Sequence, residues 1–249
     1  MSGKGGVGKS TVAVNLAVSL AKRGKTVGLL DADMHGPSVP KLLGIGNLPL
    51  AVNAKGKIEP FMVRDSLKII SIAFLLSDPE SPVIWRGPVK MGAIKQFLEE
   101  VEWGSLDYLI IDLPPGTGDE PLSVAQLVPS PDGAIIVTTP QDVALISVRK
   151  SINFVKAVGL RIIGMVENMS GMVCPHCGKE IRLFNDGGVE SASKKHGIQL
   201  LGKLPLSVRI AESGDSGIPF AAAGDGEDGS AFDKITDRII TSVENGKEV

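Results

Sequence analysis

The chain has 249 residues, a formal net charge of −2 and a pI of about 6.0, with 43% hydrophobic and 4% aromatic residues. The lack of a basic excess argues against broad nucleic-acid binding, and no apolar run reaches the roughly 18 residues that a membrane span needs. Two cysteines are too few for a disulfide scaffold. No secretory signal pattern is recognisable at the start, so we expect a cytoplasmic protein.

The first recognisable element is a glycine-rich loop at residues 3–10, which reads Gly-Lys-Gly-Gly-Val-Gly-Lys-Ser. It fits G-x-x-x-x-G-K-[ST], the phosphate-binding loop. Glycines let successive backbone N–H groups converge on phosphate oxygens, and the helix that follows offers its positive end. Lys9 supplies a charge for the β- and γ-phosphates, and the Ser10 hydroxyl is suited to bind Mg²⁺. The loop therefore predicts a nucleotide site with magnesium.

Apolar periodicity predicts alternating helices and strands along the rest of the chain. The expected helices cover residues 10–23, 40–43, 89–101, 121–127, 143–158, 188–196 and 231–243. The expected strands cover residues 26–30, 67–73, 108–111, 134–138, 161–166 and 200–204. Residues 47–66 are expected to form an irregular excursion or hairpin, and residues 221–229 a flexible loop. The alternation predicts one α/β domain over 1–249, a three-layer P-loop NTPase fold with a mostly parallel central sheet and helices on both faces.

One strand is missing from this pattern. A phosphate-binding loop normally follows a strand, but only Met1 and Ser2 precede Gly3. Either the sequence is truncated or misassigned at its start, or the fold tolerates the loss of a central strand, and we favour the first interpretation. We expect the loss to affect stability rather than chemistry.

Acidic residues follow two of the expected strands, where ligands of open α/β sheets gather. Asp31 and Asp33 come after the strand that follows the first helix. Asp112 ends an apolar strand in the Walker B form, and we expect it to hold the Mg²⁺ shell through water. Gly116 and Gly118 are expected to let backbone amides contact the γ-phosphate and shift when it leaves. The structural alternative for Asp33 is an aspartate that only caps a turn.

Cys174 and Cys177 form a C-x-x-C pair, which we expect an insertion at residues 171–186 to carry. Thiolates at this spacing can bind one soft metal, but a closed tetrahedral site needs four ligands. A two-fold symmetric dimer would bring two pairs together as a Cys₄ site, suited to a bridging [4Fe–4S] cluster or to Zn²⁺. A redox dithiol and a structural or chance pair remain alternatives.

Three features together resemble a known family: the second loop lysine, Lys4; the run Asp-Leu-Pro-Pro-Gly-Thr-Gly-Asp at residues 112–119; and the cysteine pair. The chain resembles the Mrp (ApbC) iron–sulfur carriers, deviant Walker A proteins related to Min- and Par-type ATPases and the nitrogenase iron protein. The resemblance implies that Lys4 reaches the partner subunit's nucleotide and that Asp33 orients the attacking water and contacts Mg²⁺ through water. It also implies that Asn168 contacts the adenine edge and that Pro205 belongs to a second adenine wall.

These assignments give a catalytic set of Lys4, Lys9 and Asp33. The expected nucleotide-binding residues are Gly3, Lys4, Gly5, Gly6, Val7, Gly8, Lys9, Ser10, Thr11, Gly116, Asn168 and Pro205. The absence of a guanine motif, Asn-Lys-x-Asp, favours ATP over GTP.

The resemblance implies a homodimeric, slow ATPase that binds a [4Fe–4S] cluster between its subunits and transfers it to apo iron–sulfur proteins. No nucleic-acid or membrane partner is expected. We also expect loss of the γ-phosphate to relax residues 112–119 and alter the cysteine site. The alternatives are a positioning ATPase of the Min or Par type and a nucleotide switch stapled by Zn²⁺ without a cluster.

Overall fold

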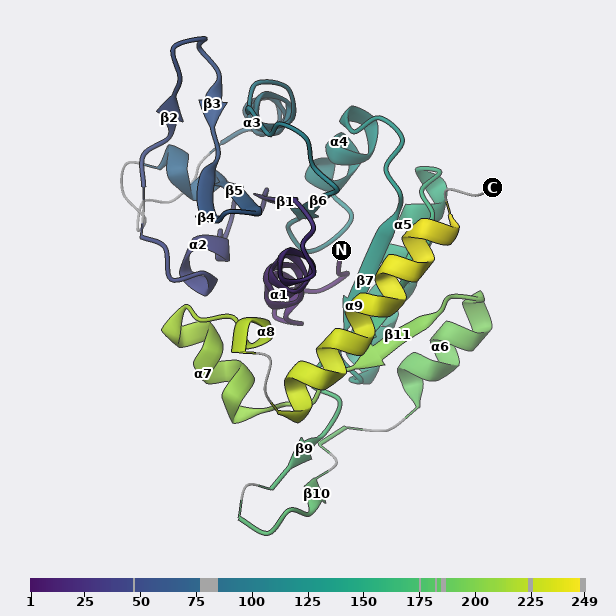
Figure 1. Ribbon diagram of the computed structural model, residues 1–249. Coiled ribbons are helices and arrows are strands. Elements are labelled where there is room, and N and C mark those ends of the chain that lie inside the picture. Colours follow the sequence, from purple (N-terminus) through teal and green to yellow (C-terminus); the bar gives the residue numbers. More distant parts are fainter. Residues whose placement is uncertain are drawn as a thin grey trace.

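The computed structural model describes residues 1–46, 48–76, 85–174, 176–181, 183–184, 187–223 and 226–246. Two sheets form its centre (Figure 1). The first has the order β4-β5-β1-β6 and joins β4 (Phe61–Arg64), β5 (Leu67–Ser71), β1 (Val27–Asp31) and β6 (Tyr108–Asp112). The second has the order β11-β8-β7 and joins β11 (Leu200–Lys203), β8 (Ile162–Glu167) and β7 (Ala134–Thr138). Within these two sheets the pairings are parallel, except that the edge strand β4 runs antiparallel to β5.

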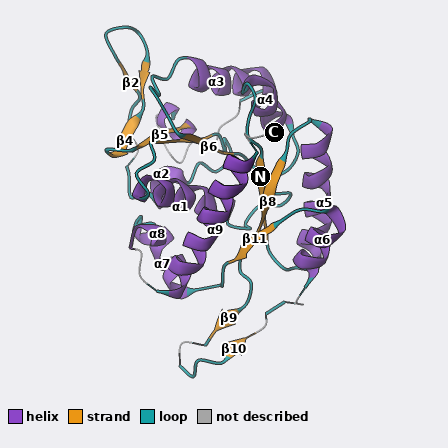
Figure 2. Cartoon of the chain, turned by 45° about the vertical axis from the view of Figure 1, so that its right-hand side comes forward, coloured by secondary structure: helices purple, strands orange, loops and turns teal. Residues whose placement is uncertain are grey.

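Helices cover both faces of the sheets (Figures 1 and 2). They are α1 (Lys9–Lys22), α2 (Val39–Leu42), the 3₁₀ helix Ile72–Leu75, α3 (Gly87–Glu99), α4 (Asp119–Leu127), α5 (Asp142–Ala157), α6 (Gly188–His196), α7 (Val208–Ser216), α8 (Phe220–Ala223) and α9 (Glu227–Asn245). Buried aliphatic residues of α1 and α9 form one core with β1 and β8, while α3 and α4 pack on the other face of the first sheet. Helices α5 and α6 cover the opposite face of the second sheet. The predicted three-layer α/β fold is confirmed.

The C-terminal third contains more helix than the sequence predicted. Helix α7 was not expected, and the predicted flexible loop at 221–229 is wrong, because α8 covers its start and α9 begins at Glu227. Residues 224 and 225 of that loop lie outside the described residues. Helix α8 is held by its buried face, on which Phe220 packs edge-on against Phe232 with ring centroids 5.3 Å apart.

Two short hairpins leave the body. In residues 47–66, β2 (Ala51–Val52) pairs antiparallel with β3 (Ile58–Glu59), as expected of a hairpin there, although Asn47 is outside the described residues. The second hairpin, β9 (Met172–Val173) and β10 (Glu180–Ile181), projects from the molecule next to β11 (Figures 1 and 2). Among the described helices none combines the length and apolar character that a membrane crossing requires.

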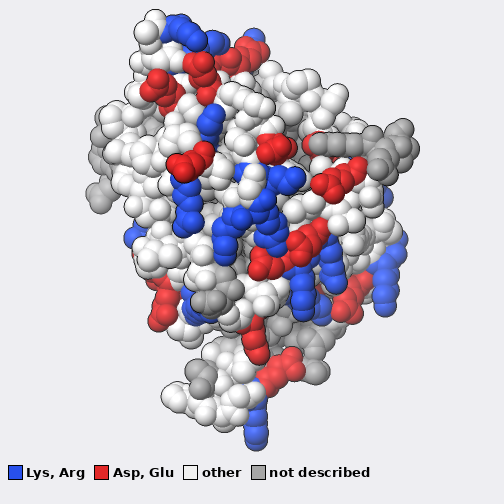
Figure 3. Space-filling view, in the orientation of Figure 1, with Lys and Arg blue, Asp and Glu red and all other residues white. Residues whose placement is uncertain are grey.

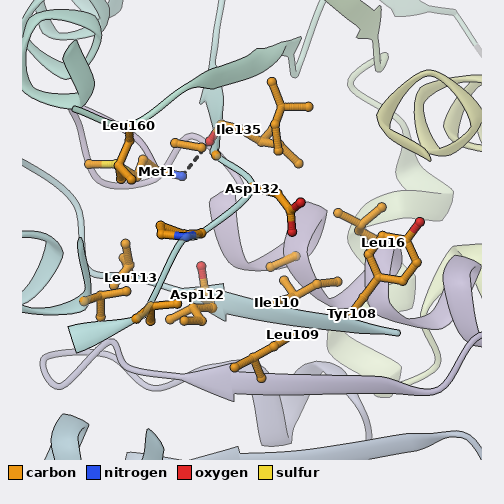
Figure 4. Close-up of a pocket in the computed structure, with 18 of the residues that line it drawn as sticks. Met1, Leu16, Tyr108, Leu109, Ile110, Asp112, Leu113, Asp132, Ile135 and Leu160 are labelled. Atoms are coloured by element: carbon orange, nitrogen blue, oxygen red, sulfur yellow. Dashed lines mark hydrogen bonds between the residues drawn. The ribbon is translucent and has the colours of Figure 1, made fainter. Parts of the chain in front are cut away.

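The start of the chain lies between the two sheets. The Met1 amine donates to Ile135 O at 2.7 Å and Val137 N donates to Met1 O at 2.9 Å, which is the hydrogen-bonding pattern of a parallel bridge to β7. Beside Met1 a cavity of about 350 Å³ separates β6 from β7 (Figure 4). Its walls are largely aliphatic and include Leu16 and Ile110. This is the place in the sheet where the strand before the loop was expected.

Candidate functional site

The glycine-rich loop has the backbone that its sequence predicts. Gly6 and Gly8 have φ values of 76° and 84°, a region that favours glycine, and Gly8 directly precedes the first residue of α1. Gly3 has a different constraint, because a Cβ there would lie 2.2 Å from the Ser147 carbonyl oxygen of α5. The loop is thus shaped by two left-handed turns and by close contact with a neighbouring helix, and it ends at the N-terminus of α1.

Lys9 is buried at the centre of the predicted site. Its Nζ lies 2.8 Å from Asp112 Oδ1 and 3.7 Å from Asp33 Oδ2, and it donates to Ser10 Oγ at 3.3 Å. Asp112 is 1% exposed, yet its Oδ2 has no hydrogen-bond partner within the described part of the chain. The structure therefore brings together four side chains that the sequence assigned to the phosphates and magnesium.

Asp31 is a buried acid for which sequence analysis predicted no role. It stands opposite Asp112 in the register of β1 and β6, and burial, followed by the Asp112 charge, raises the pKa of Asp31 to about 7. Its Oδ2 accepts from Ser71 Oγ at 2.9 Å and from Val39 N at 3.2 Å, while Oδ1 accepts from Asp33 N at 3.2 Å. Asp31 thus fixes both ends of the loop that carries Asp33.

A polar cluster ties this loop to the segment after Asp112. Lys90 Nζ of α3 lies 2.9 Å from both Glu120 Oε1 of α4 and His35 Nε2. Burial raises the pKa of Glu120, but the hydrogen bond and charge of Lys90 outweigh that effect and lower it. These residues come from three separate segments, and no short motif marks them in the sequence.

Lys4 and Gly116, both at the phosphate loop, differ in how freely they can reach a phosphate: Lys4 is exposed, whereas the Gly116 amide is already hydrogen-bonded. Lys4 is exposed, as expected of a side chain that reaches another subunit. The Gly116 backbone has a φ of 101°, and its amide donates to Ser2 O at 2.8 Å. This hydrogen bond must break before the Gly116 amide can contact a phosphate. Gly5 and Gly6 are exposed on the loop, Val7 is buried beneath it, and Thr11 is half-buried in the first turn of α1.

Asn168 and Pro205 lie on adjoining segments at the end of the second sheet. Asn168 is 6% exposed, and its Nδ2 donates to Val7 O of the loop at 2.9 Å. Pro205 is joined to the same region because Leu206 N donates to Gly171 O at 2.7 Å. The amide of Asn168 therefore supports the phosphate loop, a contact that sequence reasoning did not predict.

The cysteine pair sits at the tip of the hairpin formed by β9 and β10. Cys174 is half-buried and Cys177 is exposed, and both are free thiols. Cys174 N donates to Lys179 O and Gly178 N donates to Cys174 O, each at 2.9 Å, which closes the turn. Hydrogen bonds from the backbone of Cys177 and then of His176 lower the pKa of Cys174. Pro175, between these residues, lies outside the described part of the chain.

The hairpin supplies an incomplete metal site. Within the described residues of the chain, no group of three or more histidine, cysteine, aspartate or glutamate side chains is arranged to hold a metal ion. Two thiols alone leave half of a tetrahedral site unfilled. A second source of ligands is needed before this pair can hold a metal or cluster tightly.

Comparison with known proteins gives consistent matches over nearly the whole chain. A family model described as ParA, NUBPL iron-transfer P-loop NTPase, matches residues 1–240. A relative named iron-sulfur cluster carrier protein in Methanocaldococcus jannaschii is 52% identical over 248 residues, covering 100% of this chain and 85% of the relative. The protein of the same name in Saccharolobus solfataricus is 49% identical over 248 residues, covering 99% of this chain and 83% of the relative.

Solved structures agree with the fold. A nucleotide-binding protein from Archaeoglobus fulgidus, solved with ADP, is 41% identical and superposes with a TM-score of 0.78, covering 92% of this chain and 87% of that chain. The septum site-determining protein MinD from Pyrococcus horikoshii, solved with Mg-ADP, has a TM-score of 0.69 at 22% identity, covering 100% of this chain and 97% of that chain. At that identity the second likeness concerns the fold alone.

Proposed function

The chain belongs to the ParA family of NUBPL-type iron-transfer P-loop NTPases, and on this premise we propose that it is an ATP-hydrolysing carrier of iron–sulfur clusters. In this proposal two copies form a cytoplasmic homodimer, hold a [4Fe–4S] cluster between them and transfer it to apo-proteins. One observation carries the proposal: an exposed C-x-x-C hairpin is attached to the same segment, through Asn168, that supports the phosphate loop.

The nucleotide part of the proposal rests on the cluster around Lys9. The loop amides and Lys9 bind the phosphates of ATP, while Asn168 and Pro205 lie toward the adenine. The donor set fits Mg²⁺, because Asp112 Oδ2 is a buried oxygen without a partner in the described structure and Ser10 adds a hydroxyl. Ser10, Asp112 and Asp33 would hold the ion. The ion, when bound, neutralises charge on the phosphates.

Hydrolysis in this site is chiefly a matter of positioning. Asp33 orients a water toward the γ-phosphorus. A bond forms from the water oxygen to phosphorus, the bond from phosphorus to the ADP oxygen breaks, and the protons of the water leave with the phosphate product. Lys9 and the partner subunit's Lys4 stabilise the charge that develops on the phosphate oxygens. Because Lys4 is exposed on its own subunit, it is free to act across the dimer. A slow turnover is sufficient, since hydrolysis serves to change the state of the dimer.

The cargo site is completed by symmetry. Cys174 and Cys177 from each subunit give four thiolates, which suit a bridging [4Fe–4S] cluster. The lowered pKa of Cys174 favours the thiolate that binds iron. The exposed position of the hairpin leaves the cluster within reach of a recipient protein (Figure 1).

Anaerobic reconstitution with iron and sulfide tests this proposal. We expect broad visible absorbance, about four irons and four sulfides per dimer, and loss of the chromophore in Cys174→Ser and Cys177→Ser with ATP binding retained. His176→Ala, in the same turn, is the matched control and retains the chromophore. Bound zinc with no visible absorbance indicates a zinc-stapled nucleotide switch instead. A monomer that keeps a stoichiometric cluster contradicts the shared site.

A positioning ATPase of the Min or Par type is less well supported. Such proteins need a basic face for DNA or a basic amphipathic helix for a bilayer. On the face shown in Figure 3, basic and acidic side chains are interspersed. Helix α9 carries Asp233 and Asp237, which form ion pairs with Arg23, so its surface is not uniformly basic. Neither function uses the cysteine pair.

A further inference from the structure

Glu167 is a buried carboxylate that the nucleotide chemistry does not use. It ends β8, where it pairs in register with Thr138 on one side and Lys203 on the other, and it is 3% exposed. Its Oε2 has no hydrogen-bond partner among the described residues, and Oε1 lies 3.8 Å from Lys203 Nζ. A buried carboxylate with only one distant cationic partner is unfavourable for stability. Glu167 makes one further side-chain contact, and that contact indicates a different role.

That contact is made to the turn leading to the cysteine hairpin. Ser170 Oγ donates a hydrogen bond to Glu167 Oε1. The backbone is held in the same place, because Ser170 N donates to Leu204 O and Leu204 N donates to Glu167 O, each at 2.8 Å. Between them Met169 has a φ of 57°, a left-handed conformation that is unfavourable for a residue with a side chain. Glu167 and its neighbours thus fix a strained, sharply defined turn.

One end of this turn touches the phosphate loop. Asn168 Nδ2 donates to Val7 O at 2.9 Å, and a Cβ on Gly8 would lie 2.1 Å from the same nitrogen. No side chain fits between Gly8 and Asn168, and the hydrogen bond to Val7 O links the loop backbone directly to Asn168. Asn168 is only two residues from Ser170, so a displacement of Asn168 reaches the turn directly.

The other end of the turn sets the direction of the hairpin. Gly171 O accepts from Leu206 N at 2.7 Å, and the next two residues, Met172–Val173, form β9. Cys174 follows at once. A rigid turn therefore converts a movement at Asn168 into a movement of the thiols, while a loose turn absorbs it.

We propose that Glu167 is a positioning residue for the cysteine pair: through Ser170 it stiffens the turn at residues 168–171, so that the state of the phosphate loop sets the position and exposure of Cys174 and Cys177 within one subunit. This inference rests on the proposed nucleotide-dependent carrier function. It differs from a route through residues 112–119, because it needs no change at the dimer interface.

Thiol reactivity of the metal-free protein tests the link without a cluster. The rates at which a disulfide reagent modifies Cys174 and Cys177 are measured with no nucleotide, with Mg-ADP and with a non-hydrolysable Mg-ATP analogue. The dissociation constant of each nucleotide is measured on the same samples. We expect nucleotide to change the wild-type rate at least about fivefold, the lower end of ordinary coupling between sites.

The decisive variant is Ser170→Ala, which removes the hydroxyl that joins the turn to Glu167. We expect it to bind nucleotide normally while the rate ratio falls to near one. Ser170→Thr keeps a hydroxyl and restores the ratio, and Ser216→Ala, an exposed serine at the end of α7, leaves it unchanged. Glu167→Gln serves as a second variant that keeps an acceptor for Ser170 but loses the charge, and we expect an intermediate ratio.

Each other outcome counts against the inference. A wild-type rate that ignores bound nucleotide shows that the hairpin is not coupled to the loop. A Ser170→Ala protein with the full wild-type ratio shows that Glu167 does not act through Ser170. Failure to bind nucleotide at all contradicts the proposed function instead, and it is detected separately by the binding measurement.

Discussion

Lys9 Nζ and Asp112 Oδ1 lie 2.8 Å apart, with side chains that are 9% and 1% exposed. The residue that the loop offers to a phosphate is thus paired with the acid that ends β6. The pairing is possible because the N-terminus of α1 lies over the carboxyl ends of β1 and β6, whose register places Asp31 beside Asp112. The ion pair of Lys9 with Asp112 therefore contributes to the stability of the fold as well as to nucleotide binding.

Lys9→Met is expected to reduce stability as well as abolish ATP binding. Without the lysine, Asp112 remains buried and without a cation, and breaking a buried pair by removing one partner typically lowers the free energy of unfolding by about 3 kcal/mol or more. The double variant Lys9→Met/Asp112→Asn leaves no unpaired charge there and is expected to recover part of the loss. Urea denaturation of both single variants and the double variant measures this; strictly additive effects would contradict it.

Lys4→Ala is expected to leave stability within about 0.5 kcal/mol of wild type, because the side chain is exposed. Its ATP turnover is expected to fall at least about 100-fold, the effect of losing one charge-stabilising group. A mixture of Lys4→Ala with Asp33→Asn distinguishes the two subunits. If Lys4 serves the partner's nucleotide, the mixed dimer has one complete site and regains activity, whereas a lysine acting within its own subunit gives no recovery.

The elements that the sequence predicted well are those with a clear local signal. The apolar run of β7 and the glycine-bounded α6 have the expected limits, Ala134–Thr138 and Gly188–His196. Helix α7 has a one-sided apolar pattern, but it has only nine residues and contains Gly214, which disfavours a helix interior, so the pattern is too short to identify it. Helix α9 begins four residues early because Glu227 and Asp228 favour its N-terminus despite Gly229.

The candidate site was predictable where a motif fixes both residue type and spacing. The glycine-rich loop, Asp112 and the cysteine pair are of this kind. The contact of Asn168 with Val7 joins residues 161 positions apart, and it follows from how β8 and the loop meet in space. Glu167 had no signal at all, because a buried acid and a surface acid look alike in a single sequence.

Met169→Gly is expected to raise the free energy of unfolding by about 0.5–1 kcal/mol. Glycine relieves the left-handed backbone strain of about 1–2 kcal/mol, and the greater freedom of the unfolded chain offsets part of the gain. Ser130→Gly is a matched control, since Ser130 has a φ of 48° in a distant turn. Thermal and urea denaturation should show similar gains for both, whereas only Met169→Gly should weaken the effect of nucleotide on thiol reactivity. An equal loss of coupling in both variants would point to a global effect.

For the chain that begins at Met1, titration of the Met1 amine is expected to make stability rise with pH between about 5 and 8, while Asp31, whose pKa is raised to about 7, makes it fall with pH up to about 7. Burial, followed by the Lys9 charge, lowers the pKa of the Met1 amine from 8.0 to about 5. In this window the unfolded chain carries a proton that the folded chain lacks. Burial of the amine therefore costs no stability above about pH 8, and the cost grows as the pH falls to about 5. A shift of this size corresponds to about 4 kcal/mol. N-terminal acetylation removes the amine but leaves Asp31, so the stability of the free protein relative to the acetylated protein should rise with pH over this window.

From the cavity between β6 and β7 we expect that residues added ahead of Met1 change the stability of the protein. A Val- and Ile-rich pentapeptide fused ahead of Met1 can extend the bridge that Met1 makes with β7 and place side chains in the aliphatic cavity (Figure 4). Each buried side chain is expected to add about 2 kcal/mol to the free energy of unfolding. A Gly-Ser pentapeptide of equal length also moves the amine out of its buried position but fills no space, so it isolates the packing contribution. An unchanged melting temperature in the apolar fusion, relative to the Gly-Ser fusion, would show that this cavity does not accept a strand.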